Sequence, residues 1–407
     1  MDMRQILHLT TFRLFLAIIQ VLFLSSTLLY SQSPGRIRFG VIGDYGNAGQ
    51  PESDVANLVK GWNPDLIITT GDNNYELGAA STIDQNIGQY YHEFIFPYAG
   101  TYGQGDTVNR FFPSLGNHDW NTPGAAPYLN YFTLPGNERY YEFVRGPVHF
   151  FAIDSDGREP DGNSSTSTQG NWLKARLAAS TARWKMVYMH HPPYSSGSVH
   201  GSTSVMQWPF RQWGATAVLA GHDHTYERLI KDSLVYFVNG LGGRSIYSFG
   251  TPIAGSVRRY KDDYGAMLVE ASADSIMFRF ITRTGAVIDS FTVRAIATSV
   301  TGEDYIITPE EYMLWQNYPN PFNPSTRIRF GSGGSGLVWL KVYDMLGREV
   351  ATLLNEVKQP GEYAVEWNAS GLSSGVYIYR LEAPDALLRE SGQRGYVVRA
   401  KTMIFLR

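Results

Sequence analysis

The chain has 407 residues, a length typical of two or three domains, and its apolar residues (43%) and aromatic residues (14%) suffice for a packed core. Its net charge of −3 provides no basic surface for a polyanion, so nucleic acid is not an expected partner. The sequence contains no cysteine, which excludes disulfides, thiolate metal ligands and cysteine nucleophiles, so any metal must be bound by oxygen and imidazole groups.

The N-terminus has the pattern of an export signal. Basic residues precede an apolar run over residues 14–24, and small and polar residues follow it. The run is short for a bilayer span, although an uncleaved anchor helix is the alternative. We therefore expect a signal peptide over residues 1–31 and a mature chain that lies outside the inner membrane.

Strand patterns alternate with helical patterns up to residue 220. The expected strands are apolar and are followed by Gly or Pro turns; they cover residues 36–42, 65–70, 111–115, 184–189 and 216–220. Two helices are expected between them, one capped by Ser53 and one over residues 171–179. This alternation is typical of an α/β fold with parallel strands.

After residue 255 the pattern changes to consecutive strands. Residues 264–271, 275–281 and 287–293 have the pattern of antiparallel strands joined by tight turns. We expect them to complete the sheet of a first domain over residues 36–296. Residues 297–312 mix Thr, Ser, Gly and acidic side chains without clear periodicity, and we expect a linker there.

The last segment, residues 313–407, is predicted to be a separate all-β domain. Pro319, Pro321 and Pro324 lie near its start, where they exclude a helix and a central strand because proline lacks an N–H donor. Short strand patterns separated by Gly and Ser turns follow, which favours a small Ig-like sandwich. The segment contains no histidine, so we expect no metal chemistry in it.

Polar and ionisable side chains follow the predicted strands of the first domain. They are Asp44, Asp72, Tyr75, Asn117, His118, His190, His222 and His224. The carboxyl ends of strands in an open α/β sheet meet at one crevice, so these groups are expected to converge. Taken singly, each motif has a plainer interpretation as a turn or a helix cap. Together they are a ligand set for Fe, Mn or Zn, and two cations about 3.5–4 Å apart need a bridging carboxylate.

The motifs G-D-x-G, G-D-x-x-Y, G-N-H-D, V-x-x-H and G-H-x-H together resemble the signature of the calcineurin-like metallophosphoesterases. The phenol of Tyr75 makes the set similar to the short, tartrate-resistant type of purple acid phosphatase. Related phosphoesterases without this phenol carry D-x-H at the first motif, where this chain has Gly46. The resemblance implies an αββα sandwich for the first domain.

The resemblance also implies a binuclear centre of Fe(III) and a divalent Fe, Zn or Mn ion. Its Fe(III) ligands would be Asp44, Asp72, Tyr75 and His224. Its divalent-ion ligands would be Asp72, Asn117, His190 and His222, which makes Asp72 the bridge. The V-x-x-H spacing selects His190, and its neighbour His191 is expected to line the pocket.

Hydrolysis by in-line attack of a metal-bound hydroxide on phosphorus follows from such a centre. His118 is expected to protonate the leaving group, with Asp119 orienting its ring; the alternative is that His118 only supports the neighbouring ligand. His200, in a Ser/Gly-rich loop, resembles a substrate-contacting histidine of the family, with a solvated loop side chain as the alternative. Three further candidates are expected to be structural: His92, His149 and Asp154.

The C-terminal domain resembles a type IX secretion sorting domain in four stretches, residues 314–326, 342–350, 374–380 and 401–403. The resemblance implies export across the outer membrane with the type IX secretion machinery as partner, and a tail that is either removed or used for surface attachment. A passive β-sandwich appended for binding is the alternative. Residues 384–399 are longer and more charged than the pattern, which leaves their strand pairing open.

Three functions fit these patterns. The first is an exported, acid-phosphatase-like enzyme that hydrolyses phosphomonoesters. The second is a phosphodiesterase or nucleotide hydrolase that uses the same metals. The third is a surface-exposed binding protein with a vestigial site, which is disfavoured because no ligand position has been lost.

Overall fold

The computed structural model describes residues 35–295, 305–308, 312–333, 336–359, 361–384 and 396–407. The expected signal peptide over residues 1–31 lies outside the described residues. Within the described ranges, no helix has the length and apolar character needed to cross a membrane.

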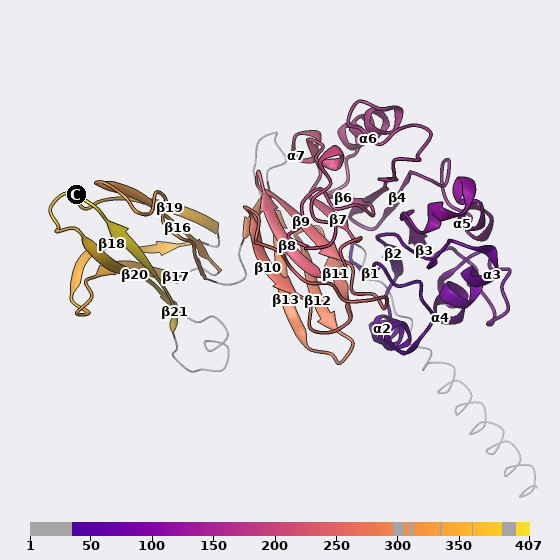
Figure 1. Cartoon of the computed structure of the whole chain (residues 1–407), viewed down its shortest axis with the longest axis horizontal. Helices are drawn as coiled ribbons and strands as arrows, with labels where there is room; N and C mark the ends of the chain where they lie inside the picture. The colour runs from indigo at the N-terminus through magenta and orange to yellow at the C-terminus, as the bar shows by residue number, and fades with distance from the viewer. Residues whose placement is uncertain (1–34, 296–304, 309–311, 334–335, 360, 385–395) are drawn as a thin grey trace, which may run out of the picture.

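The first domain contains two seven-stranded sheets (Figure 1). The first has the order β14-β13-β12-β11-β1-β2-β3. Its strands are β1 (Ile37–Ile42), β2 (Leu66–Thr69), β3 (Phe111–Pro113), β11 (Gly265–Ala271), β12 (Ser275–Thr282), β13 (Val287–Ala295) and β14 (Tyr305–Thr308). β1, β2 and β3 run parallel, and the consecutive strands β11 to β14 extend the sheet from β1 as an antiparallel meander.

The second sheet has the order β10-β8-β9-β7-β6-β5-β4. Its strands are β4 (Tyr141–Arg145), β5 (Val148–Ala152), β6 (Trp184–Tyr188), β7 (Ala217–Ala220), β8 (Tyr226–Lys231), β9 (Leu234–Asn239) and β10 (Ser256–Tyr260). β5, β6, β7 and β9 run parallel, and the outer strands are antiparallel to their neighbours. The parallel strands therefore form one end of the first sheet and the middle of the second, and in each sheet their carboxyl ends lie on the same side.

The two sheets pack face to face through aromatic side chains. The ring of Phe39 on β1 lies 4.9 Å from that of Phe150 on β5, edge to face, as aromatic pairs prefer. Adjacent residues of a strand point to opposite faces, so Gly40 and Phe151 face outward. Helices cover these outer faces: Val59 of α2 lies over Gly40, and α6 packs in the same cluster as Phe151.

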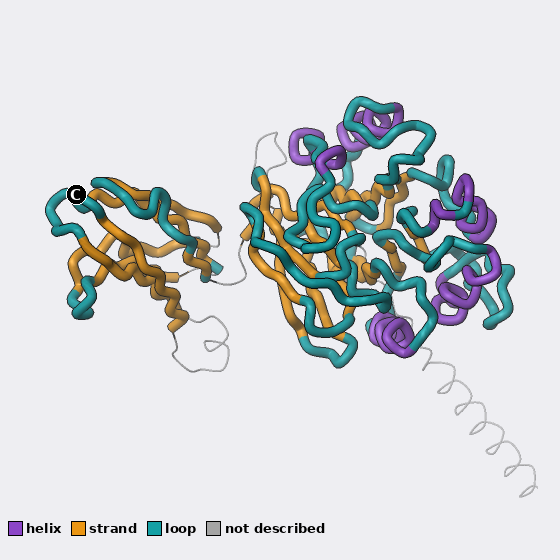
Figure 2. The backbone as a smooth tube through the Cα atoms, viewed as in Figure 1, coloured by secondary structure: helices purple, strands orange, loops and turns teal. Residues whose placement is uncertain are grey.

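The helices are α2 (Gln50–Gly61), α3 (Ala80–Ile83), α4 (Gln89–Tyr91), α5 (Ala126–Tyr131), α6 (Thr168–Ala179) and α7 (Phe210–Trp213). Figure 2 shows them on the outside of the paired sheets, with long loops between strands and helices. The expected α/β fold with helices outside two sheets, an αββα sandwich, is confirmed.

Two local expectations are wrong. Helix α2 begins at Gln50, before the predicted cap Ser53, because Pro51 fits the first turn, where an N–H group has no partner within the helix. Residues 305–308, inside the expected linker, form β14 and pair with β13. The antiparallel part of the first sheet therefore continues beyond residue 296.

The C-terminal segment forms two antiparallel sheets, with orders β15-β16-β19 and β18-β17-β20-β21. The strands are β15 (Met313–Leu314), β16 (Ser325–Ser332), β17 (Gly336–Tyr343), β18 (Glu349–Lys358), β19 (Gly361–Asn368), β20 (Gly375–Pro384) and β21 (Tyr396–Phe405). Side chains from both sheets, such as Phe330, Trp367, Val342 and Tyr379, form one core. This arrangement is consistent with the small β-sandwich that the sequence predicts, and β20 pairs with β21 over their full lengths on either side of residues 385–395.

Candidate metal centre

The seven predicted ligands lie at the carboxyl ends of parallel strands in both sheets. Loops after β1, β2 and β3 of the first sheet and after β6 and β7 of the second sheet carry them. The ligands are Asp44, Asp72, Tyr75, Asn117, His190, His222 and His224. Because the sheets pack face to face, two sets of strand ends meet across the sandwich, and the structure brings all seven side chains together.

One group of side chains surrounds Tyr75. Its hydroxyl donates to Asp44 Oδ1 at 3.2 Å and lies 3.2 Å from His224 Nε2. His224 Nε2 lies 3.4 Å from the same Asp44 oxygen. All three side chains are buried, so their polar atoms have little contact with water. A carboxylate, a phenol and an imidazole thus point at a common position.

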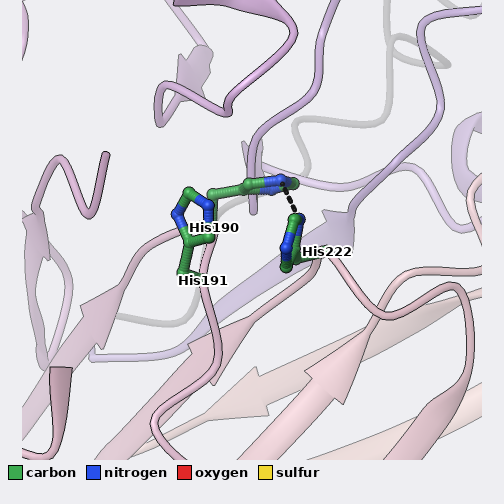
Figure 3. A group of neighbouring side chains, drawn as sticks. All are labelled: His190, His191 and His222. Atoms are coloured by element: carbon green, nitrogen blue, oxygen red, sulfur yellow. Dashed lines mark hydrogen bonds between the residues drawn. The ribbon is translucent and has the colours of Figure 1, made fainter. Parts of the chain in front are cut away.

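A second group surrounds His190. Its Nε2 atom lies 3.0 Å from Asn117 Oδ1, 3.3 Å from Asp72 Oδ2 and 3.1 Å from His222 Nδ1. Figure 3 shows the His190 and His222 rings meeting at these nitrogen atoms, with His191 beside them. Asp44, Asp72 and His190 each offer a ligand atom, and these atoms lie within 4.8 Å of one another, so the two groups adjoin.

The hydrogen bonding of His190 tests whether this donor set fits a metal ion. His190 Nδ1 lies 2.9 Å from the Thr70 carbonyl oxygen, which can only accept, so Nδ1 carries a proton. In the neutral ring Nε2 is then an acceptor, yet it faces the acceptor oxygens of Asn117 and Asp72. Buried acceptors that face one another need a cation or an extra proton between them. The residues therefore fit a bound metal ion.

The charges of these side chains lead to the same conclusion. Burial opposes a charge on His190, but Asp72, with Asp44, raises its pKa to about 10. Burial likewise opposes a charge on Asp72, but His190 and His118 hold the pKa of this carboxyl well below its usual range. Burial and the two aspartates raise the pKa of Tyr75 well above its usual range. A proton on His190 thus balances Asp72, and only a strong positive charge nearby would make the Tyr75 phenolate stable.

The backbone at the ligands takes conformations that few side chains adopt. Asp44, Asp72 and His222 have φ values of 54°, 53° and 69°. A Cβ at Gly116 would lie 2.2 Å from the backbone nitrogen of Asp72, and one at Gly221 would lie 2.5 Å from Asp44 Oδ2. Glycine is required at both positions because two loops touch there.

His118 lies at the edge of this group, as predicted, but another residue orients its ring. His118 Nδ1 lies 2.7 Å from the carbonyl oxygen of Glu76, so it donates there and leaves Nε2 free, 3.9 Å from Asp72 Oδ2. The expectation that Asp119 orients this ring is not met. Asp119 is buried and accepts from the backbone and side-chain nitrogens of Asn73 at 3.2 and 2.8 Å, which joins the two ligand loops.

The structure places two further histidines against the ligands. His191 Nδ1 lies 2.9 Å from Ser155 Oγ, and its ring lies 4.4 Å from that of His222. Burial and the charge of His190 lower the pKa of His191 to about 3, so its ring is neutral. His200 stacks on His222 with ring centroids 3.9 Å apart and an interplanar angle of 28°.

The remaining candidates have contacts elsewhere. His92 Nδ1 lies 2.8 Å from the Gly88 carbonyl oxygen, and His149 Nδ1 lies 2.8 Å from Ser180 Oγ. Asp154 accepts from the indole N–H of Trp120 at 2.8 Å. These contacts are those of structural side chains.

The loop after β9 supplies contacts that the sequence analysis missed. Ser245 Oγ lies 2.9 Å from His224 Nδ1, and the Tyr247 ring stacks on His224 at 4.0 Å. The Arg244 guanidinium lies 5.2 Å from the centre of the Tyr75 ring and pairs with Glu76. The run of glycines at 240, 242 and 243 directly after a strand was the signal that could have identified this loop.

Two parts of the chain match known families. Residues 37–226 match the calcineurin-like phosphoesterases, and residues 316–389 match the secretion system C-terminal sorting domain. These matches confirm both resemblances that the motifs indicated.

Curated relatives include plant and animal phosphatases. Purple acid phosphatase 17 of Arabidopsis thaliana is 25% identical over 247 residues, which cover 53% of this chain and 71% of the relative. Human tartrate-resistant acid phosphatase type 5 is 25% identical over 258 residues, which cover 54% and 78%.

Solved structures share the fold. Purple acid phosphatase PPD1 from yellow lupin seeds superposes with a TM-score of 0.53 at 18% identity, covering 65% of this chain and 54% of PPD1. GAP50 of Plasmodium gives 0.51 at 20% identity, covering 63% and 87%.

Proposed function

We propose that this chain, which carries a calcineurin-like metallophosphoesterase domain followed by a secretion sorting domain, is an exported phosphatase that hydrolyses phosphomonoesters with two metal ions. The observation that carries the proposal is the pair of adjoining ligand groups around Tyr75 and His190, which Asp72 can serve together. The two curated relatives described above are acid phosphatases by name.

The proposed ligands fall into the same two groups that the distances between their side chains define. Asp44, Tyr75 and His224 would hold Fe(III), which the phenol favours. Asn117, His190 and His222 would hold a divalent Fe, Zn or Mn ion. Asp72 would bridge, since its carboxylate lies against His190 and its charge acts on Tyr75. Two bound ions would supply the positive charge that neutralises the phosphate oxygens and activates the attacking water.

The protein's own groups would bind and orient the substrate. His118 donates from Nδ1 to Glu76, so its Nε2 is available to protonate the leaving oxygen of the ester. The fixed Nδ1 contact keeps the ring from turning away from the metal ligands. His200 would contact the phosphate beside His222, since its ring stacks on that of this proposed ligand.

The decisive experiment compares p-nitrophenyl phosphate with bis-p-nitrophenyl phosphate on protein whose metal content has been measured. We expect two ions per chain and faster turnover of the monoester. Faster turnover of the diester would favour a phosphodiesterase. A fully loaded protein that hydrolyses neither ester would leave the binding-protein interpretation.

The sorting-domain match supports export and attachment at the cell surface. We propose a signal peptide over residues 1–31, a catalytic domain from residue 36 to Thr308 and a sorting domain over residues 313–407. Pairing of β14 with β13 supports a first boundary after Thr308. In a host with type IX secretion, a protein that lacks residues 313–407 should stay inside the cell, so that its activity is no longer found at the surface. Undiminished surface activity would contradict the role of the tail.

A further inference from the structure

The loop that carries His200 is fixed by hydrogen bonds. Residues 195–201 contain five Ser and Gly residues, and a solvated loop side chain was the alternative expected for His200. Ser198 donates from its backbone to the Ser248 carbonyl oxygen at 2.9 Å, and Gly250 donates to Ser196 at 2.8 Å. The loop is therefore held against the loop after β9, whose Tyr247 stacks on a metal ligand.

A buried carboxylate holds the tip of this loop. Asp223 is fully buried and accepts from Ser195 Oγ at 2.5 Å, from the Gly201 backbone N–H at 3.0 Å and from the His200 backbone N–H at 3.2 Å. Hydrogen bonds to an ionised acceptor are stronger than those between neutral groups, and a buried carboxylate needs several of them. The three donors come from both ends of one short loop, so Asp223 fixes its curvature.

The fit between this carboxylate and the loop is close. A Cβ at Gly197 would lie 2.2 Å from the carboxyl carbon of Asp223. Glycine at this position lets the loop backbone pass directly over the carboxylate. The contact thus depends on the absence of a side chain at Gly197 as well as on the charge of Asp223.

A second carboxylate holds only the root of the loop. Glu227 on β8 accepts from the Ser196 backbone and hydroxyl, both at 2.6 Å, and from Ser256 Oγ at 2.5 Å. Among the contacts found in the described chain, none joins Glu227 to residues 197–201. Asp223 is the carboxylate that reaches His200 itself.

We propose that Asp223 is a positioning residue that fixes His200 against the metal ligands, an inference that rests on the proposed function. Asp223 stands between the ligands His222 and His224 in the sequence, and its carboxylate binds the backbone of His200, whose ring stacks on His222. The short segment from His222 to His224 therefore fixes the positions of both the ligand His222 and the substrate-contacting ring of His200. Substrate affinity depends on Asp223 through His200, although Asp223 touches neither substrate nor metal.

The test combines hydrogen exchange with a double-mutant cycle on metal-loaded full-length protein. Asp223→Ala leaves three donors without their acceptor, so the amides of residues 197–201 should exchange faster by about tenfold or more. With p-nitrophenyl phosphate, Asp223→Ala and His200→Ala should each raise KM by roughly tenfold with little change in kcat, and the double variant should be no worse than either. Gly197→Ala should reproduce the effect of Asp223→Ala without removing the charge.

Controls separate this role from a general loss of stability. Asp84→Ala removes another carboxylate with several donors, Tyr98, Tyr131 and Thr101, and should leave KM unchanged. Additive effects of Asp223→Ala and His200→Ala, unchanged exchange in residues 197–201, or loss of metal in both Asp223→Ala and Gly197→Ala would each overturn the inference. An inactive wild type would overturn the proposed function, and the exchange measurement would still decide whether Asp223 holds the loop.

Discussion

Substituting Gly46 by alanine should separate the two loops that supply the aspartate ligands. Gly46 follows Asp44 by two residues, and its carbonyl oxygen accepts from the Tyr75 backbone at 2.8 Å. A Cβ at this position would lie 1.9 Å from the Asn73 carbonyl oxygen and 2.6 Å from the Asn74 nitrogen. The obstructing atoms belong to the backbone, so no side-chain rotation can relieve the overlap.

The required displacement can be worked out from these distances. Real Cβ contacts are essentially never shorter than 3.0 Å, so the backbone around Gly46 and Asn73 must separate by at least 3.0 − 1.9 = 1.1 Å. Ligand distances in metal sites tolerate only about 0.2 Å. Asp72 and Tyr75 adjoin Asn73 and would move away from Asp44. A misplacement of about 1 Å can reduce turnover by about 100-fold even where the ligands remain.

Metal analysis after gel filtration tests this reasoning. Gly46→Ala should retain less than one ion per chain at metal concentrations that load the wild type fully, and kcat/KM should fall by about 100-fold or more. Gly61→Ala is the matched control, because no atom lies within 4 Å of its added Cβ at the end of α2. Full metal loading of Gly46→Ala with a wild-type circular dichroism spectrum would refute the steric argument.

Three further substitutions test other parts of the site and its surroundings. Asp72→Asn should lose metal and activity together in metal analysis and turnover assays, because one amide cannot offset two cations; retained turnover would contradict the bridging role. Tyr75→Phe should abolish a visible charge-transfer band of the iron-loaded protein, and an unchanged absorption spectrum would exclude the phenol as a ligand. Burial raises the pKa of the Glu52 carboxyl well above its usual range and outweighs the backbone hydrogen bond from Asn47, so the folded chain holds a proton there. The stability that this proton contributes is complete below the unfolded pKa of about 4.3 and is lost as pH rises toward the folded pKa. In urea melts, the free energy of unfolding of Glu52→Gln should therefore rise relative to that of the wild type by up to about 1.4 kcal/mol per pH unit above pH 4.3. Parallel pH curves for the two proteins would contradict this.

The sequence predicted which side chains gather at the sheet edge because strand ends carry their own signals. An apolar run that stops at Gly-Asp or Gly-His marks both the end of a buried strand and a polar group at the sheet edge. Asp72 after β2 and His190 after β6 could be identified from their own strands, without knowing which side chains lie next to them in space. The α/β class likewise follows from strands that are apolar on both faces, such as β7 (Ala217–Ala220), which is buried at every residue, whereas the αββα arrangement came from the family resemblance.

Contacts between loops could not be predicted in the same way. Asp119 is adjacent to His118 in the sequence, but the short helical turn at Asp119–Asn121 directs its carboxylate to Asn73 instead. Asp223 lies between two ligands, and nothing in its local pattern indicates that its acceptor oxygens reach residues 195–201. Such contacts depend on how two loops from different strands meet. They become visible only when the three-dimensional fold is known.

The geometry of the proposed ligands indicates how a bound metal ion would stabilise this fold. Asp44, Asp72 and His222 adopt left-handed backbone conformations, which cost on the order of 1 kcal/mol or more each and persist only where surrounding contacts fix them. Asp44 directs an acceptor oxygen toward Tyr75, and Asp72 and His222 direct acceptor atoms toward His190, in a buried space. Neither the strain nor the facing acceptors favour the folded state by themselves. A cation that bound only the folded chain would offset both, and the energy of metal binding would then contribute directly to the stability of the strand ends that create the site.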